Sequence, residues 1–164
     1  MNDDDFMGIA IGLARRGHGN VSPNPSVGCL IVKDGLIVGR GWTRPGGRPH
    51  AETEALGRAG GAAREATAFV TLEPCAHYGQ TPPCAQALID AGITRVVIGT
   101  GDPDPRVQGG GISMLRDAGI AVTEDVRSDE ARDAALGFLM RIEKNRPLVT
   151  VKLATTLDGR IATT

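Results

Sequence analysis

The spacing of hydrophobic positions changes along the chain between the period of a strand and the period of a helix. Short continuous apolar runs predict strands over 27–32, 36–38, 68–72, 96–98 and 120–122. Apolar residues at helical spacing predict helices within 6–14, 51–59, 82–91, 112–118 and 131–142. A turn at 33–35 makes a hairpin of the first two strands, and the later alternation of strand and helix favours parallel pairing. We therefore predict an α/β fold of three layers, a mixed five-stranded sheet flanked by helices.

The last part of the chain does not continue this pattern. Residues 145–147, Asn-Arg-Pro, interrupt the final predicted helix, and a further strand is expected over 148–154. That strand has no evident partner in the rest of the sequence. We therefore predict one domain over residues 1–146 and the opening segment of a second domain over 147–164.

Composition and charge narrow the function of the first domain. The 164 residues carry a net charge of −1 and only 3% aromatic residues, which argues against a nucleic-acid-binding face and favours a small-molecule substrate. No apolar run approaches the roughly 20 residues that cross a membrane, and the acidic N-terminus is unlike a signal peptide. We therefore expect a cytoplasmic protein without nucleic-acid or membrane partners. In that compartment, three cysteines indicate metal binding or chemistry in preference to disulfides.

One imidazole and two thiols have the spacing of a metal site. His50 precedes a predicted helix, Cys75 follows a predicted strand, and Cys84 begins a helix after two prolines. Three protein ligands with a fourth position open are typical of catalytic zinc. Glu52 lies two positions after His50 and can act as a general acid and base beside the metal. The pattern predicts zinc-assisted hydrolysis.

Another interpretation of these residues stays open at this point. His77 can serve as a fourth ligand, which would close the site and make the zinc structural. The protein would then be a zinc-stabilised module without catalysis. Cys29 lies inside an apolar run and is expected in the core.

Four segments carry a resemblance to a known family: 22–28, 49–52, 71–84 and 102–105 with 109–111. They resemble the deaminase domain of the bifunctional riboflavin-biosynthesis deaminase/reductase. The most specific feature is the step of nine positions from Cys75 to Cys84, because cytidine, guanine and tRNA-adenosine deaminases generally keep two residues between their cysteines.

The resemblance implies a cytidine-deaminase-like fold and hydrolytic deamination of a phosphorylated diaminopyrimidine, 2,5-diamino-6-ribosylamino-4(3H)-pyrimidinone 5′-phosphate. It implies that zinc is held by His50, Cys75 and Cys84 and that Glu52 moves the protons. It also moves His77 from possible fourth ligand to the substrate pocket. The substrate-binding residues that it implies are Asn24, His77, Gln80, Asp102 and Asp104. Residues 152–154 and 157–162 resemble the start of the family's reductase domain, so we expect a fused reductase in the natural protein and no reductase activity from this chain. A homodimer is also expected.

Three positions depart from the family's usual pattern at the phosphate side of the pocket: Thr43, Gln80 and Asp104. One explanation is lineage drift, with Arg44, Arg48 or Arg106 supplying the missing charge. Another is a substrate without phosphate. We favour drift, because the segment between the cysteines is intact. Deamination of another small base or nucleoside, such as cytidine or guanine, is the alternative function within the same chemistry.

Overall fold

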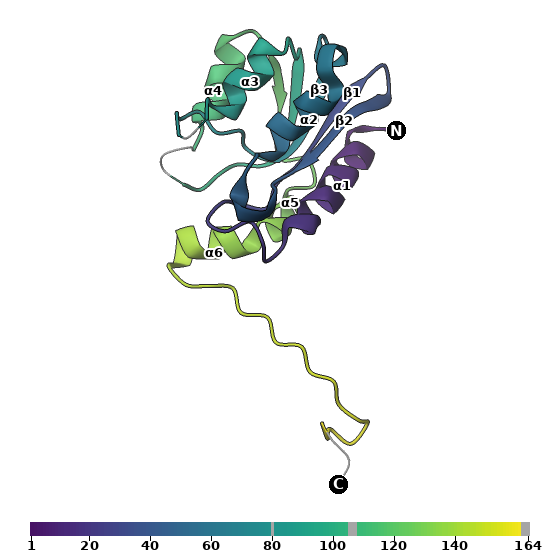
Figure 1. Cartoon of the computed structure of the whole chain (residues 1–164), viewed down its shortest axis with the longest axis vertical. Helices are drawn as coiled ribbons and strands as arrows, with labels where there is room; N and C mark the ends of the chain where they lie inside the picture. The colour runs from purple at the N-terminus through teal and green to yellow at the C-terminus, as the bar shows by residue number, and fades with distance from the viewer. Residues whose placement is uncertain (80, 105–107, 162–164) are drawn as a thin grey trace.

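The computed structural model describes residues 1–79, 81–104 and 108–161 (Figure 1). Its centre is a five-stranded sheet in the order β2-β1-β3-β4-β5. The strands are β1 (Gly28–Lys33), β2 (Leu36–Trp42), β3 (Thr67–Leu72), β4 (Arg95–Thr100) and β5 (Ala121–Thr123). β1 pairs antiparallel with both β2 and β3, whereas β3–β4 and β4–β5 are parallel. The predicted mixed sheet is confirmed.

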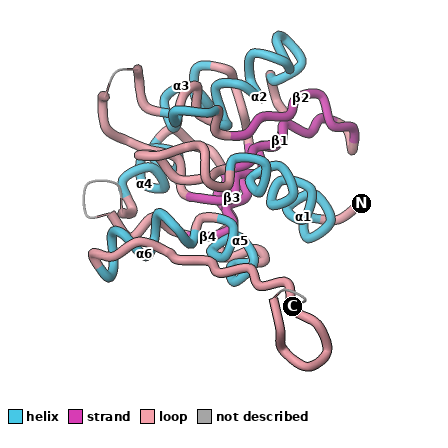
Figure 2. The backbone as a smooth tube through the Cα atoms, turned by 60° about the horizontal axis from the view of Figure 1, so that its bottom comes forward, coloured by secondary structure: helices cyan, strands magenta, loops and turns pink. Residues whose placement is uncertain are grey.

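Helices cover both faces of this sheet, which gives the predicted three layers (Figure 2). They are α1 (Asp3–Ala14), α2 (Ala51–Ala59), α3 (Cys84–Asp90), α4 (Gly110–Asp117), α5 (Ser128–Ala134) and α6 (Leu136–Lys144). Alternate residues of β1 point to opposite faces: Cys29 and Ile31 join the core under α2, α3 and α4, whereas Leu30 and Val32 join the core under α1 and α5. Cys29 is fully buried, as expected.

Helix α1 begins where the acidic sequence predicts it. The Asn2 side chain accepts a hydrogen bond from the backbone N–H of Asp5, and the Asp5 carboxylate accepts one from the backbone N–H of Asn2. This capping box satisfies two backbone donors at the helix start. Three acidic residues in the first turn also complement the positive end of the helix dipole.

Strand β2 is longer than its apolar run, which predicted a strand over 36–38 only. The strand continues to Trp42 through Gly39 and Gly41. A Cβ atom on Gly39 would lie 2.3 Å from the carbonyl oxygen of Ala55, and one on Gly41 would lie 2.1 Å from that of Ala51. These glycines therefore belong to a strand on which α2 packs backbone to backbone, and not to a loop.

Two further predictions near the C-terminus are corrected. The single helix expected over 131–142 is divided into α5 and α6 at Ala135, whose φ of −103° and ψ of 5° interrupt the helix. The strand expected over 148–154 is an exposed segment that makes no pairing with the described strands and extends away from the domain (Figure 1). Within the described parts of the chain, no helix is both long and apolar enough to span a membrane.

Candidate active site

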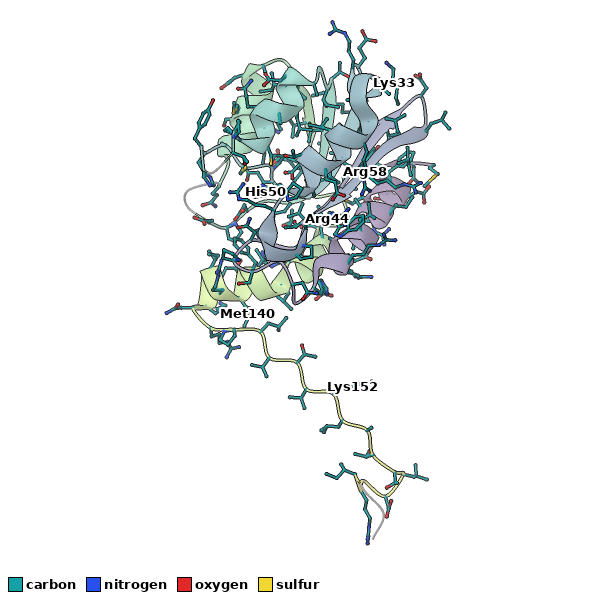
Figure 3. All side chains as sticks on the ribbon, viewed as in Figure 1. Lys33, Arg44, His50, Arg58, Met140 and Lys152 are labelled. Carbon is teal, nitrogen blue, oxygen red and sulfur yellow. The ribbon has the colours of Figure 1, made fainter. Side chains whose placement is uncertain are left out.

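Three predicted metal ligands meet at the ends of secondary-structure elements. His50 is the residue directly before α2, Cys84 is the first residue of α3, and Cys75 lies three residues after β3. Their ligand atoms all lie within 4.8 Å of one another. In Figure 3, His50 lies in the body of the domain where α2 begins, far from the extended segment that carries Lys152.

The geometry of these atoms fits zinc. His50 Nδ1 lies 3.3 Å from Cys84 Sγ. A tetrahedral zinc ion with bonds of about 2.0 Å to nitrogen and about 2.3 Å to sulfur would separate two such donors by about 3.5 Å. One imidazole and two sulfurs are ligands that zinc accepts readily. The cluster found among the described His, Cys, Asp and Glu residues contains these three and not His77, so the four-ligand site with His77 is not supported.

The surroundings of Cys75 favour a thiolate, whereas the hydrogen bond with Cys75 and burial raise the pKa of the Cys84 thiol. The pKa of Cys75 is lowered to about 4, chiefly by a hydrogen bond from the Cys84 side chain, and the backbone N–H of Cys84 also donates to Cys75 Sγ over 3.3 Å. That N–H is at the N-terminus of α3, where the helix dipole stabilises negative charge. A metal ion would deprotonate both thiols outright.

Glu52 lies in the first turn of α2, beside the ligand cluster. Its side chain is almost completely buried, and burial raises the pKa of its carboxyl to about 6, against the opposing effect of the nearby His50. A carboxyl group with this pKa can both accept and release a proton near neutral pH. The arrangement can therefore carry out proton transfer next to a metal ion.

A cavity of about 430 Å³ opens onto this cluster. It is lined by His50, Glu52 and Cys75 and by four of the predicted substrate residues: Asn24, His77, Asp102 and Asp104. Gln80, the fifth, lies outside the described residues. The volume is within the range of small-molecule sites. Asn24 is held by donating its Nδ2 to the carbonyl oxygen of Gly47 over 2.7 Å, which leaves Nδ2 3.1 Å from His50 Nε2.

Glu73 is a residue of this cavity whose role the sequence did not reveal. It is buried directly after β3, and its carboxylate accepts hydrogen bonds from the backbone N–H groups of Gly109, Gly111 and Ile112 over 3.0–3.3 Å. A longer contact of 3.5 Å reaches the N–H of Asp102. The carboxylate thus joins the loop after β4 to the start of α4 and places Asp102 and Asp104 in the cavity wall. In the sequence, this arrangement was indicated only by an acidic residue before Pro-Cys and by a distant run of three glycines.

The departures from the family pattern have separate structural settings. The hydroxyl of buried Thr43 accepts a hydrogen bond from the backbone N–H of Val27 over 3.0 Å, so this residue serves the backbone of the cavity wall. Arg44 forms an ion pair with Glu54 and lies over the Trp42 ring, 4.0 Å from its centroid; it does not line the cavity. Arg48 does line it. Arg106 lies outside the described residues.

The fold and the ligand cluster define a class of zinc-dependent deaminase. Residues 1–100 match the cytidine and deoxycytidylate deaminase zinc-binding region. The chain is similar to the riboflavin biosynthesis protein RibD of Haemophilus influenzae, with 52% identity over 157 residues that make up 96% of the chain and 42% of that protein.

Two further relatives narrow the assignment. The diaminohydroxyphosphoribosylamino-pyrimidine deaminase of Buchnera aphidicola subsp. Acyrthosiphon pisum is 48% identical; the match covers 90% of this chain and 100% of that protein. The crystal structure of a diaminohydroxyphosphoribosylaminopyrimidine deaminase/5-amino-6-(5-phosphoribosylamino)uracil reductase from Thermotoga maritima superposes with a TM-score of 0.89 at 46% identity, over 98% of this chain and 46% of that one. The chain belongs to the family of riboflavin-biosynthesis pyrimidine deaminases and spans less than half the length of its two-domain relatives.

Proposed function

We propose that this chain removes an amino group hydrolytically from 2,5-diamino-6-ribosylamino-4(3H)-pyrimidinone 5′-phosphate, giving the 5-amino-6-ribosylaminouracil 5′-phosphate and ammonia. The observation that carries the proposal is the cluster of His50, Cys75 and Cys84 beside a cavity that the buried Glu52 also lines. The Buchnera aphidicola deaminase, which the chain covers completely at 48% identity, supports the substrate class.

The residues of the site have separate roles in this reaction. His50, Cys75 and Cys84 would hold the zinc ion, which when bound supplies hydroxide at neutral pH by lowering the pKa of water to about 7. Glu52 takes a proton from the attacking water, passes it to the ring nitrogen, and transfers a proton to the departing amine. The C–N bond breaks as the new C–O bond is retained, and the amine leaves as ammonia. Asn24, which lies beside His50 in the cavity wall, orients the pyrimidine.

Deamination of cytidine or guanine is not favoured. The segment between Cys75 and Cys84 is longer than in those enzymes, and the relatives with about half of their residues identical are riboflavin-biosynthesis proteins. A zinc-stabilised module without catalysis would have no need of a buried carboxyl group beside an incomplete set of ligands.

The direct test is ammonia release. The zinc-loaded chain is incubated separately with the phosphorylated diaminopyrimidine, cytidine and guanine, with metal-stripped protein as the control. We expect rapid release from the diaminopyrimidine alone, and only with zinc. Faster ammonia release from cytidine or guanine would show that the proposed substrate is wrong. No release from any of the three compounds at full zinc occupancy would favour the non-catalytic module.

Residues 147–164 are proposed as the opening of a reductase domain that continues in the natural protein. The proposal is supported by the resemblance of 152–154 and 157–162 to that domain and by the full exposure of residues 149–161. Deleting 147–164 should leave the unfolding temperature and the deaminase activity unchanged; a clear loss of either would place this segment in the first domain. A cytoplasmic homodimer stays a prediction, which light scattering and cell fractionation can test.

A further inference from the structure

Two arginines line the cavity from different parts of the chain. Arg48 lies in the loop that leads to His50, and Arg141 lies on α6. Arg48 Nη1 donates to the Thr81 hydroxyl over 2.8 Å, and Arg141 Nη2 donates to the carbonyl oxygen of Pro23 over 2.6 Å. A guanidinium group has five N–H donors, so each keeps further donors beyond these single bonds.

Neither guanidinium forms an ion pair with a carboxylate of the described residues. Several arginines elsewhere on the domain do: Arg44 and Arg58 with Glu54, Arg95 with Asp3, Arg116 with Glu124, Arg127 with Glu130 and Arg132 with Glu143. Four carboxyl groups of the described residues also line the cavity: Glu73 accepts from backbone N–H groups, Glu52 lies beside the ligand cluster, and Asp102 and Asp104 lie on the loop after β4. The positive charge of the two cavity arginines is therefore available to an anionic ligand.

We propose that Arg48 and Arg141, the arginine pair, bind the phosphate group of the substrate in this chain. The proposal rests on the proposed function and names the residues of this chain that would contact the phosphate. Guanidinium groups bind phosphate through charge-assisted, often bidentate hydrogen bonds. Because Arg48 stands two positions before His50 and Arg141 contacts the loop of Asn24, the pair fixes the phosphate relative to the groups that hold the base.

A purely structural role is the competing explanation. The bond to Pro23 could serve only to hold the Asn24 loop, and the bond to Thr81 only to hold the segment between the cysteines. Loss of such a role would impair every substrate to the same extent. Loss of a phosphate contact would impair only the phosphorylated substrate, so the comparison of two substrates separates the explanations.

The experiment measures kcat/KM of the zinc-loaded chain for the phosphorylated diaminopyrimidine and for its dephosphorylated form. The variants are Arg48→Gln, Arg141→Gln, their combination, Arg141→Lys, and Arg116→Gln as the matched control on α4, outside the cavity. We expect each single Gln variant to lower the preference for the phosphorylated substrate by roughly tenfold or more, through KM, with the double variant lower still. Arg141→Lys should recover part of the preference, and Arg116→Gln should leave it unchanged.

A second readout does not depend on catalysis. Calorimetry of ribose 5-phosphate and ribose should show that the unaltered chain prefers the phosphorylated sugar, that added salt weakens this preference, and that the double variant lacks it. Equal losses of kcat/KM for both substrates, or unchanged ribose 5-phosphate affinity in the double variant, would overturn the assignment. If no pyrimidine released ammonia, the proposed function would fail, whereas the sugar-binding measurement would still decide the role of the arginine pair.

Discussion

The cavity contains two groups of residues that are positioned in different ways. At the ligand end, His50, Cys84 and Glu52 are placed by the first turns of two helices, and Cys75 by the strand end between them. The arginine pair, in contrast, combines Arg48 from the loop before His50 with Arg141 from a helix more than 90 positions further along the chain. The metal ligands therefore depend on local helix and strand ends, whereas the proposed phosphate contacts depend on the packing of distant segments.

The largest expected effect is at the ligand end. Cys84→Ser removes a thiolate that no neighbouring described residue can replace, so we expect zinc content to fall from about one ion per chain to nearly none and deamination to be abolished. Cys29→Ala, at the fully buried cysteine outside the cluster, is the control and should keep its zinc. Metal analysis of freshly purified protein makes the measurement. Retention of a full zinc equivalent in Cys84→Ser would contradict the ligand assignment.

Glu52→Gln should come next in magnitude. The amide keeps the shape of the side chain but cannot move protons, so kcat should fall by about 10²–10⁴-fold while zinc stays bound. Glu54→Gln, two positions along the same helix and paired with Arg44 and Arg58, is the matched control. Ammonia release and zinc content are measured on the same samples. Deamination that survives Glu52→Gln with intact zinc would exclude the proposed proton transfer.

Glu73→Gln tests whether the site needs the loop after β4 to be anchored to the start of α4. The amide offers one acceptor oxygen where the carboxylate accepts several backbone N–H groups, so the loop that carries Asp102 and Asp104 should loosen. We expect kcat/KM to fall by about tenfold and the free energy of unfolding by about 2 kcal/mol. Exposed Glu65→Gln serves as the control. Denaturant titration together with kinetics would show whether stability and activity fall together; a normal kcat/KM would mean that the loop needs no such anchor.

Thr43→Val should have the smallest effect. It keeps the branched shape but leaves the backbone N–H of Val27 without its acceptor, at a cost of about 1–2 kcal/mol in unfolding free energy. The preference for the phosphorylated over the dephosphorylated substrate should not change, because the hydroxyl is already engaged with the backbone. Thermal unfolding and the ratio of the two kcat/KM values are the measurements. A changed ratio would move Thr43 into the phosphate site.

Local sequence predicted the ligand end because its residues follow signals that act over a few positions. His50 and Glu52 share one helix start, and the prolines before Cys84 announce another. The mixed five-stranded sheet and the buried Cys29 were likewise accessible from apolar periodicity. Arg141 was not, because a surface arginine on an amphipathic helix has no local mark of a ligand contact. The hydrogen bonds of Glu73 were hidden for the same reason, since its partners follow it by some 30 or more positions.

Other differences between the predicted and the observed elements have physical causes that local sequence does not show. Gly39 and Gly41 lower strand propensity, yet the strand passes through them because packing against α2 outweighs that preference. The division of the last predicted helix at Ala135 leaves the apolar stripe intact, so periodicity alone could not locate it. Residues 148–154 pair with none of the described strands, edge strands β2 and β5 included, which the pattern of a single segment cannot reveal.

The backbone contact between β2 and α2 has a consequence for protein design. No side chain separates Gly41 from the carbonyl group of Ala51. Main-chain atoms alone therefore set the distance between α2 and the sheet, and with it the backbone position of His50. Transfer of the ligand motif into another scaffold would therefore fail unless Gly39 and Gly41 were transferred with it. Because the contact involves only main-chain atoms, the surrounding side chains can be redesigned extensively, provided that both positions remain glycine.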